Sequence, residues 1–241
     1  MIGDRRMARK KVKTTKLDII QCASKLFLEQ GYSNTSPRIV CDLLDISTGN
    51  LTYYFPTKEH MLAEVVKMLC GFQWEKLKEE AKEDISLVMA VCLELTTMAA
   101  MCEQDEAAKD FFLATYTSPM CLAIIRDNDT QRAKQVFRSY CPDWTDEQFM
   151  EAEIIVSGIE YATLMTTGDA VPLATRIEGA LDSILKVYNV PAEIRKTKID
   201  RALAMHYRTI GMRVLDEFRE YVEQKNEKAL EDLIGSADVA T

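Results

Sequence analysis

Apolar residues recur at three- and four-residue intervals along most of this chain. Between Thr15 and Gly31 this spacing predicts a first helix. Thr15 followed by Asp18 is typical of a capping box, and Gly31 is a natural residue for a helix end. The same spacing returns in each of the segments described below.

Ser36 and Pro37 predict the start of a second, short helix, as its N-cap and its first helical position. This helix is expected to end at Leu44, and the chain then turns. The apolar residues expected to face the core are Ile39, Val40, Leu43 and Leu44.

A third helix, equally short, is predicted to begin after Ser47 and to be anchored by Leu51 and Phe55, which lie four residues apart. Pro56 ends it. Thr57 is expected to cap a longer fourth helix that runs to about residue 82.

The rest of the chain shows helical spacing without strand alternation or internal repeats, so the predicted fold class is all-α. No Pro-, Gly- or Ser-rich linker divides the chain, and the fourth helix is therefore expected to connect a three-helix head to a larger helical body. Breaks fall at 118–119, 126–129, 141–148 and 167–172. The helices expected after residue 84 are 85–103, 106–125, 129–140, 144–168, 173–189 and 193–223, with a further turn at 226–234.

The composition agrees with a globular helical protein. Apolar residues make up 47% of the 241 residues, and nine glycines and six prolines are few for an all-β chain. Seven cysteines occur without a C-x-x-C pair, which favours reduced thiols in the cytoplasm. No apolar run is long enough for a membrane span, and no signal-peptide core follows the basic start.

Charge is divided unevenly along the chain. Through Lys58 there are ten Lys/Arg against five Asp/Glu, a net charge of +5, which leaves −13 for the rest of a chain whose total is −8. A basic head on an acidic body suits a protein whose head alone approaches a polyanion. A solvated basic tail, or one that binds an acidic protein, has the same charge pattern.

Residues 36–59, "SPRIVCDLLDISTGNLTYYFPTKE", combine two short capped helices that cross, which is the pattern of a helix-turn-helix. Asn50 can pair with adenine and Arg38 with guanine, while Tyr54 and Lys58 suit phosphate oxygens. A plain helical corner with solvated polar residues has the same spacing. The side chains of the second helix expected outside the core are Thr48, Gly49, Asn50, Thr52 and Tyr53.

Residues 15–66 resemble the TetR family of bacterial transcriptional regulators, through "IIQCASKLFLEQGYSNTS" and "RIVCDLLDISTGNLTYYFPTKEHML". The chain departs from the common family pattern at Asp45, where Gly is usual, and at Thr52, where Tyr is usual. The resemblance implies base contacts by Arg38, Thr48, Asn50 and Tyr53, and phosphate contacts by Ser36, Thr52, Tyr54 and Lys58.

The resemblance also implies a function: a ligand-responsive repressor that binds palindromic operator DNA as a homodimer. We expect a DNA-binding domain at 1–58, with its helix-turn-helix at about 35–54, and a domain for effector binding and dimerisation at 59–241. The expected partners are double-stranded DNA, a second copy of the chain and a small molecule, with no membrane and no cofactor. A helical adaptor that uses its basic N-terminus to bind an acidic partner is the alternative.

Two sets of residues in the body are candidates for the effector pocket and the dimer interface. Each set has an alternative explanation, since the same residues at helical spacing also form an ordinary core. The pocket candidates are Met89, Met98, Met101, Phe111, Phe112, Tyr116, Met120 and Phe137. The interface candidates are Ile155, Gly158, Ile159, Ala162, Ile177, Leu181, Ile184 and Leu185.

Sequence motifs for catalysis are lacking. His60 and His206 have no metal-ligand companion three or four residues away, and there is neither a Glu-x-x-His pair nor a Gly-rich phosphate loop. We therefore expect no enzyme activity and no metal site.

Overall fold

The computed structural model describes residues 15–80, 86–168 and 171–224, and these residues form helices and connecting turns without a strand. The predicted all-α fold is confirmed. The predicted turn at 226–234 lies outside the described residues. The helices are α1 (Lys16–Gln30), α2 (Pro37–Leu44), α3 (Thr48–Tyr54), α4 (Lys58–Glu80), α5 (Leu87–Gln104), α6 (Glu106–Thr117), α7 (Pro119–Phe137), α8 (Asp146–Met165), α9 (Leu173–Val187), α10 (Ala192–Ala204) and α11 (Tyr207–Gln224).

Side-chain caps set the helix starts of the head, which comprises α1, α2 and α3. Thr15 and Asp18 form the predicted capping box, and the hydroxyl groups of Ser36 and Ser47 accept from backbone N–H groups in the first turns of α2 and α3. Asp45 ends α2 in the left-handed conformation, with φ 51°. An aspartate tolerates this conformation, so the turn forms without the glycine that is usual there.

Leu51 and Phe55 are buried in the head as predicted, with 1% and 2% of their surface exposed. The prediction for α2 is wrong at Leu43, which is 63% exposed. The short α2 buries the stripe centred on Val40 and Cys41, and Leu43 lies at the rim of that stripe.

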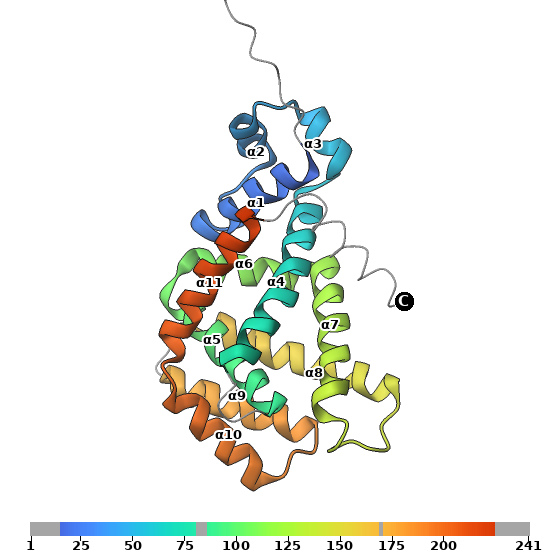
Figure 1. Ribbon diagram of the computed structural model, residues 1–241, viewed down its shortest axis with the longest axis vertical. Coiled ribbons are helices and arrows are strands. Elements are labelled where there is room, and N and C mark those ends of the chain that lie inside the picture. Colours follow the sequence, from blue (N-terminus) through green and yellow to red (C-terminus); the bar gives the residue numbers. More distant parts are fainter. Residues whose placement is uncertain (1–14, 81–85, 169–170, 225–241) are drawn as a thin grey trace, which may run out of the picture.

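α4 leaves the head and runs into the body between α11 and α7, as Figure 1 shows. α5 lies inside the body with most of its side chains buried. It is apolar enough by length and composition to cross a membrane, with a mean hydropathy of 1.3, but 72% of this 18-residue stretch is buried inside the structure. A core helix of a helical bundle has the same composition, which explains this stretch.

Two of the predicted body boundaries are wrong. The helix predicted at 106–125 ends at Thr117, and α7 then continues through the polar stretch at 126–129. Asp129 in that stretch pairs with Arg132 one turn later, so a tertiary ion-pair network satisfies residues that usually favour a turn. The helix predicted at 193–223 is broken at Met205, whose backbone is extended, and no Gly or Pro marks this break in the sequence.

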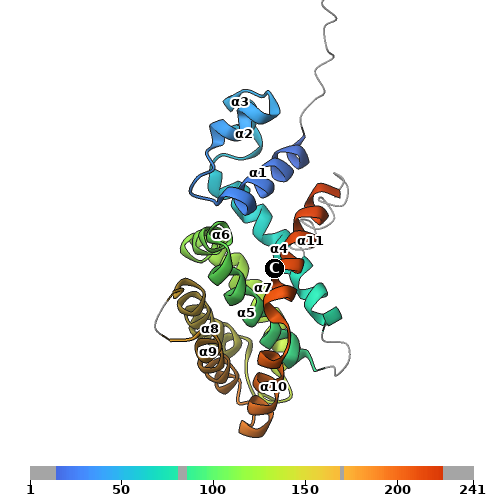
Figure 2. The ribbon, with the colours of Figure 1, turned by 90° about the vertical axis from the view of Figure 1, so that its left-hand side faces the viewer.

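The views in Figures 1 and 2 place the head at one end of an elongated molecule, with α9 and α10 toward the other. α8 and α9 run side by side on one flank of the body. α11 returns toward the head and ends beside α1.

Candidate nucleic-acid interface and buried cavity

The polar side chains of α3 form an outward surface at the tip of the head. Thr48, Gly49, Asn50 and Thr52 are exposed, and Tyr53 is 81% exposed. Leu51 on the opposite face of α3 is buried against the head, so the helix is fixed with its polar side to solvent. We call these five exposed residues, together with Arg38, the recognition surface.

Arg38 extends the recognition surface from the first turn of α2. Its side chain is 90% exposed, and its guanidinium lies 3.8 Å from the carboxylate of Asp42, which is 73% exposed. An ion pair so exposed is weak. The guanidinium therefore remains available for a partner outside the protein.

The remaining residues predicted to contact phosphate differ in how free they are. Ser36 is exposed and caps α2, and Tyr54 is half-buried with its ring against Tyr53, the two ring centres 5.1 Å apart. The hydroxyl of Thr52 donates to the carbonyl oxygen of Thr48 at 3.0 Å. The charge of Lys58 is engaged inside the protein.

Lys58 donates to the backbone oxygen of Tyr32, and its ammonium lies 3.7 Å from the centre of the Tyr32 ring. Burial lowers the pKa of this lysine. Lys58 thus joins the start of α4 to the loop after α1. Nearby, the hydroxyl of Thr57 lies 2.8 Å from Nδ1 of His60.

Residues 19–65 match the family model described as "Bacterial regulatory proteins, tetR family". The head of this chain thus matches that family across α2, α3 and the adjoining parts of α1 and α4. The predicted resemblance is confirmed. The matched segment contains α2 and α3, the two helices that carry the recognition surface. Regulation of transcription through a helix-turn-helix is the activity of this family.

A solved repressor structure shares the fold over about three quarters of this chain. SmeT, the repressor of the Stenotrophomonas maltophilia multidrug efflux pump SmeDEF, is 15% identical with a TM-score of 0.51, covering 76% of this chain and 96% of SmeT. AmtR of Mycobacterium smegmatis is 17% identical with a TM-score of 0.39, covering 84% of this chain and 96% of AmtR. A search of the curated proteins gave no match.

The head is held to the body by hydrogen bonds that the sequence did not suggest. Asp110 of α6 accepts from the backbone N–H of Ser33 at 2.7 Å and from its hydroxyl at 2.6 Å. Gly31 adopts φ 91° beside this carboxylate, and a Cβ atom there would lie 2.6 Å from its oxygen. Glycine therefore allows the loop after α1 to approach α6 closely.

Two other contacts tie the body to the start of α4 and to the head. Ser118, the cap of α7, donates to Glu59 in the first turn of α4. Arg219 of α11 donates to the backbone oxygen of Leu28 in α1 at 2.7 Å. The head is thus attached through α6 and α11 as well as through the predicted connection, α4, whose first turn is held by α7.

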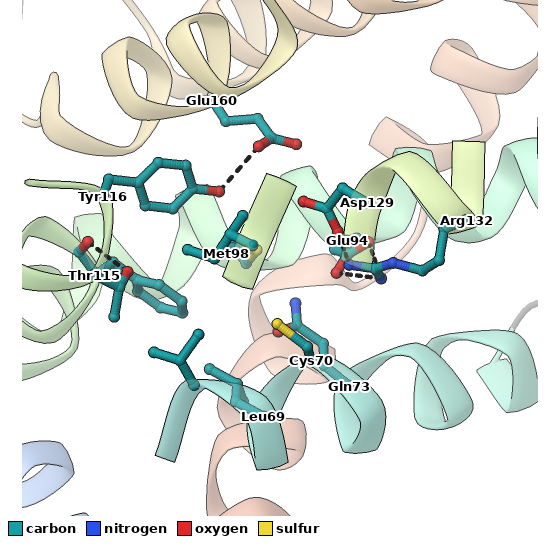
Figure 3. A pocket seen from close by; sticks show the side chains of 13 residues that line it. Leu69, Cys70, Gln73, Glu94, Met98, Thr115, Tyr116, Asp129, Arg132 and Glu160 are labelled. Carbon is teal, nitrogen blue, oxygen red and sulfur yellow. Dashed lines mark hydrogen bonds and ion pairs between the residues drawn. The ribbon is translucent and has the colours of Figure 1, made fainter. Parts of the chain in front are cut away.

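A small cavity lies in the body between α4, α5, α6, α7 and α8 (Figure 3). The volume in which the centre of a water-sized molecule fits is about 40 Å³. All the space between the lining atoms, including the part open to solvent, is about 430 Å³. Its lining residues are Val66, Leu69, Cys70, Gln73, Glu94, Met98, Phe112, Thr115, Tyr116, Ile125, Asp129, Arg132 and Glu160.

Only part of the predicted pocket set lines this cavity. Met98, Phe112 and Tyr116 do, and Phe137 and Met120 line two other hollows. Met89, Met101 and Phe111 are buried in the core, which was the alternative left open for them. Sequence reasoning missed the charged lining residues, because nothing in the chain marks which carboxylates of an acidic body turn inward.

Charged groups in the cavity pair across helices. Arg132 donates from Nη1 to both carboxylate oxygens of Glu94 at 2.9 Å, and it also pairs with Asp129. The guanidinium lies 4.9 Å from the centre of the Trp74 ring. Burial raises the pKa of Glu94, and the charge of Arg132 opposes that rise. Among the described residues no His, Cys, Asp and Glu group is arranged to hold a metal ion.

The predicted interface residues divide into two groups. Ile155 is 51% exposed, Gly158 and Ala162 are exposed, and Ile159 is half-buried. The assignment of the α9 residues to an interface is wrong for this fold: they face α5, α8 and α10 inside the subunit, so a second chain cannot reach them. These core residues are Ile177, Leu181, Ile184 and Leu185, each at most 2% exposed.

Proposed function

We propose that this protein is a ligand-responsive transcriptional repressor that binds a palindromic operator as a homodimer. The observation that carries the proposal is the recognition surface: a capped helix whose buried residues fix it in the head while Thr48, Asn50 and Tyr53 face solvent. A protruding helix of this kind can enter the major groove of DNA. Acting on genomic DNA would place the protein in the cytoplasm.

Base reading would come from side chains whose hydrogen-bonding groups match base edges. Asn50 can bond to both groups of an adenine edge, and the fork of Arg38 fits guanine. Thr48 and Tyr53 would add contacts from the start and end of α3. Ser36, Thr52 and Tyr54 would bind phosphates, while Lys58 would hold the loop after α1 in place.

Dimerisation is proposed through the outer face of α8. Met150, Ile154, Ile155 and Tyr161 expose between 38% and 58% of their surface, although they are large apolar residues. Their spacing, with Gly158 between them, places them along one face of the helix. Contiguous apolar surface of this kind on a soluble domain marks a protein interface.

The adjacent face of α9 suits a close approach by a second copy. Its exposed residues Thr175, Gly179 and Ser183 are small, and a Cβ atom at Gly158 or Gly179 would meet nothing within 4 Å. Two such faces related by a two-fold axis would form a self-complementary interface. Two heads would then read the two halves of a palindrome.

Effector control would act through α6 as well as α4. Phe112, Thr115 and Tyr116 of α6 line the cavity, and Asp110 of the same helix holds the head at Ser33. A ligand that displaces α6 from within therefore pulls on the head. When the distance between the two heads no longer matches the spacing of the half-sites, the dimer leaves the DNA. If the bound dimer blocks transcription, its release relieves repression.

Selection of genomic DNA fragments by the purified protein tests this proposal. We expect enrichment of a sequence with two-fold symmetry, with half-sites one helical turn apart or a multiple of it. Asn50→Ala should lose the enrichment and keep the fold. Fragments without symmetry, bound equally well by Asn50→Ala, would contradict operator reading; retention of an acidic protein partner instead would favour an adaptor.

A further inference from the structure

The cavity holds more negative than positive groups. Glu94, Asp129 and Glu160 contribute three carboxyl groups to its lining, and Arg132 contributes the single guanidinium there. Arg132 is already shared between Glu94 and Asp129. Of these three carboxyl groups, Glu160 is therefore the one that has no cationic partner among the described residues.

Glu160 enters the cavity from α8. Its carboxylate accepts from the hydroxyl of Tyr116 at 3.0 Å, and Figure 3 shows the two side chains meeting at one wall. Burial raises the pKa of Glu160 well above its usual range, and the carboxylates of Asp129, Glu153 and Glu94 raise it further. Without a cation, these surroundings favour the protonated form of Glu160 over the charged carboxylate.

Gln73 of α4 supplies a second polar group that has no partner. Its side-chain nitrogen is buried without a hydrogen-bond acceptor, and the residue is only 3% exposed. In Figure 3 this nitrogen points into the cavity, between Met98 and the carboxylates. A buried donor without an acceptor is unfavourable, and a ligand that provides an acceptor removes this cost.

Apolar side chains form the remaining walls. Leu69 and Val66 of α4, Phe112 of α6, Met98 of α5 and Ile125 of α7 surround the polar groups. A ligand must therefore be largely apolar, with polar atoms only where Glu160 and Gln73 meet it.

We propose that this cavity binds an organic cation: a largely apolar molecule whose positive charge lies against Glu160 and whose hydrogen-bond acceptor meets Gln73. The inference rests on the proposed function, since it names the effector class of that regulator. An anionic ligand would meet carboxylates instead, and a neutral one would leave Glu160 in its protonated form, without using the excess of carboxyl groups in the lining.

The cavity is smaller than such a ligand. About 40 Å³ for water-sized centres accommodates only a few waters, so an organic cation must spread the surrounding helices. The helices that line it include α4 and α6, which carry Lys58 and Asp110 at the head. Binding and displacement of the head are thereby linked.

Binding of a cation should release the proton of Glu160. Affinity for a permanent cation therefore rises with pH below the pKa of the free carboxyl group, by at most about tenfold per pH unit for one proton. The titratable and charged groups that face Glu160 set the pH range over which the cation affinity changes. They are Cys70 of α4, Glu94 of α5, Tyr116 of α6, Asp129 and Arg132 of α7, and Glu153 of α8.

Isosteric probes separate charge from shape. Benzoylcholine carries an aryl group, an ester acceptor and a quaternary ammonium, and 3,3-dimethylbutyl benzoate has the same shape with carbon in place of nitrogen. Tetraphenylphosphonium and tetraphenylborate form a second pair with opposite charges. Binding to the full-length protein without DNA is measured by calorimetry, and we expect at least one cation to bind at least about tenfold more tightly than its matched compound.

Two variants assign the contacts. Glu160→Gln keeps an acceptor for Tyr116 and should lower cation affinity at least about tenfold while leaving the neutral ester unchanged. Gln73→Leu should weaken both esters alike. Glu193→Gln, the same change at an exposed position of α10, is the control and should change neither.

Either of two results overturns the proposal: neither cation binds more tightly than its matched compound, or Glu160→Gln keeps the wild-type preference for the cation. Circular dichroism confirms that each variant is folded. The proposed function is tested separately by operator binding. If only a neutral compound binds the cavity and releases DNA, the cation proposal is wrong and the proposed ligand-responsive regulator stands. If a cation binds the cavity but leaves DNA affinity unchanged, the cation proposal stands and the proposed ligand response is wrong.

Discussion

Arg38 in the head and Arg132 in the body place the same side chain in opposite surroundings. Arg38 is 90% exposed with one carboxylate at 3.8 Å, whereas Arg132 is 12% exposed and holds two carboxylates, with Glu94 at 2.9 Å. The charge of Arg38 remains available to a partner, while that of Arg132 is neutralised within the fold. Exposure thus separates a group that recognises from a group that organises a cavity.

The largest effect is expected when the two heads are separated and each subunit is left intact. Gly158→Trp places a large side chain on the open face of α8, where nothing in the subunit is within 4 Å. The dimer should dissociate, and operator affinity should fall about 10³-fold toward the non-specific level. Light scattering and a DNA titration measure both effects.

Gly71→Trp is the matched control, because Gly71 is also an exposed helical glycine with open space around it, on α4. It should remain a dimer. A monomeric Gly158→Trp that still binds the operator with wild-type affinity would contradict the proposed interface.

Removal of the buried arginine should destabilise the body. Arg132→Met leaves Glu94 and Asp129 without their counter-charge, and breaking a buried ion pair from one side costs about 3–5 kcal/mol. Arg38→Met, the same substitution at the exposed position, should cost less than about 1 kcal/mol. Urea unfolding measures both, and equal costs would remove the distinction between the two arginines.

Removal of the exposed arginine should affect DNA instead. Arg38→Ala is expected to cost about 1–3 kcal/mol on the operator and to relax preference at one base pair in each half-site. Arg38→Lys keeps the charge and loses the fork, so it should retain non-specific affinity while losing the same base preference. A loss by Arg38→Ala that is equal on every sequence would assign the residue to phosphate.

The smallest effect concerns pH and the body alone. Glu153 is 3% exposed and bonds to Tyr188, and burial raises its pKa to about 8. A carboxyl group with a raised pKa binds its proton more tightly when folded. The free energy of unfolding should therefore decrease as pH rises from about 5 to about 8, by at most about 1.4 kcal/mol per unit for this group.

Glu153→Gln should make this pH dependence shallower, because the amide does not titrate. Glu193→Gln, at an exposed position, should keep the wild-type slope. Urea unfolding at several pH values provides the comparison. Equal slopes for wild type and Glu153→Gln would show that Glu153 does not hold the extra proton.

The head could be predicted from sequence in more detail than the body. Its helix starts follow local caps such as Ser36 and Ser47, and its polar surface follows from the burial of Leu51 four residues after Ser47. Leu43 was mispredicted because a two-turn helix buries a narrow stripe, and its width depends on neighbours far away in the sequence.

In the body, contacts between residues far apart in the sequence determine features that the local sequence pattern does not show. Asp129 lies in a stretch that favours a turn, yet Arg132 and Glu94 keep it inside α7 and beside the cavity. The link between Asp110 and Ser33 spans 77 residues and leaves no local pattern. The residues of α9 have the spacing of either a core or an interface, and only the packing of α5 and α8 against them assigns them to the core.

In the proposed function, the cavity of the body is coupled to the recognition surface of the head. The most direct measurement is the affinity of one effector with and without saturating operator DNA, together with the affinity of the operator with and without that effector. Linkage requires both affinities to fall by the same factor, because each ligand favours a different arrangement of the heads. An effector that binds equally well to free and DNA-bound protein would contradict the account.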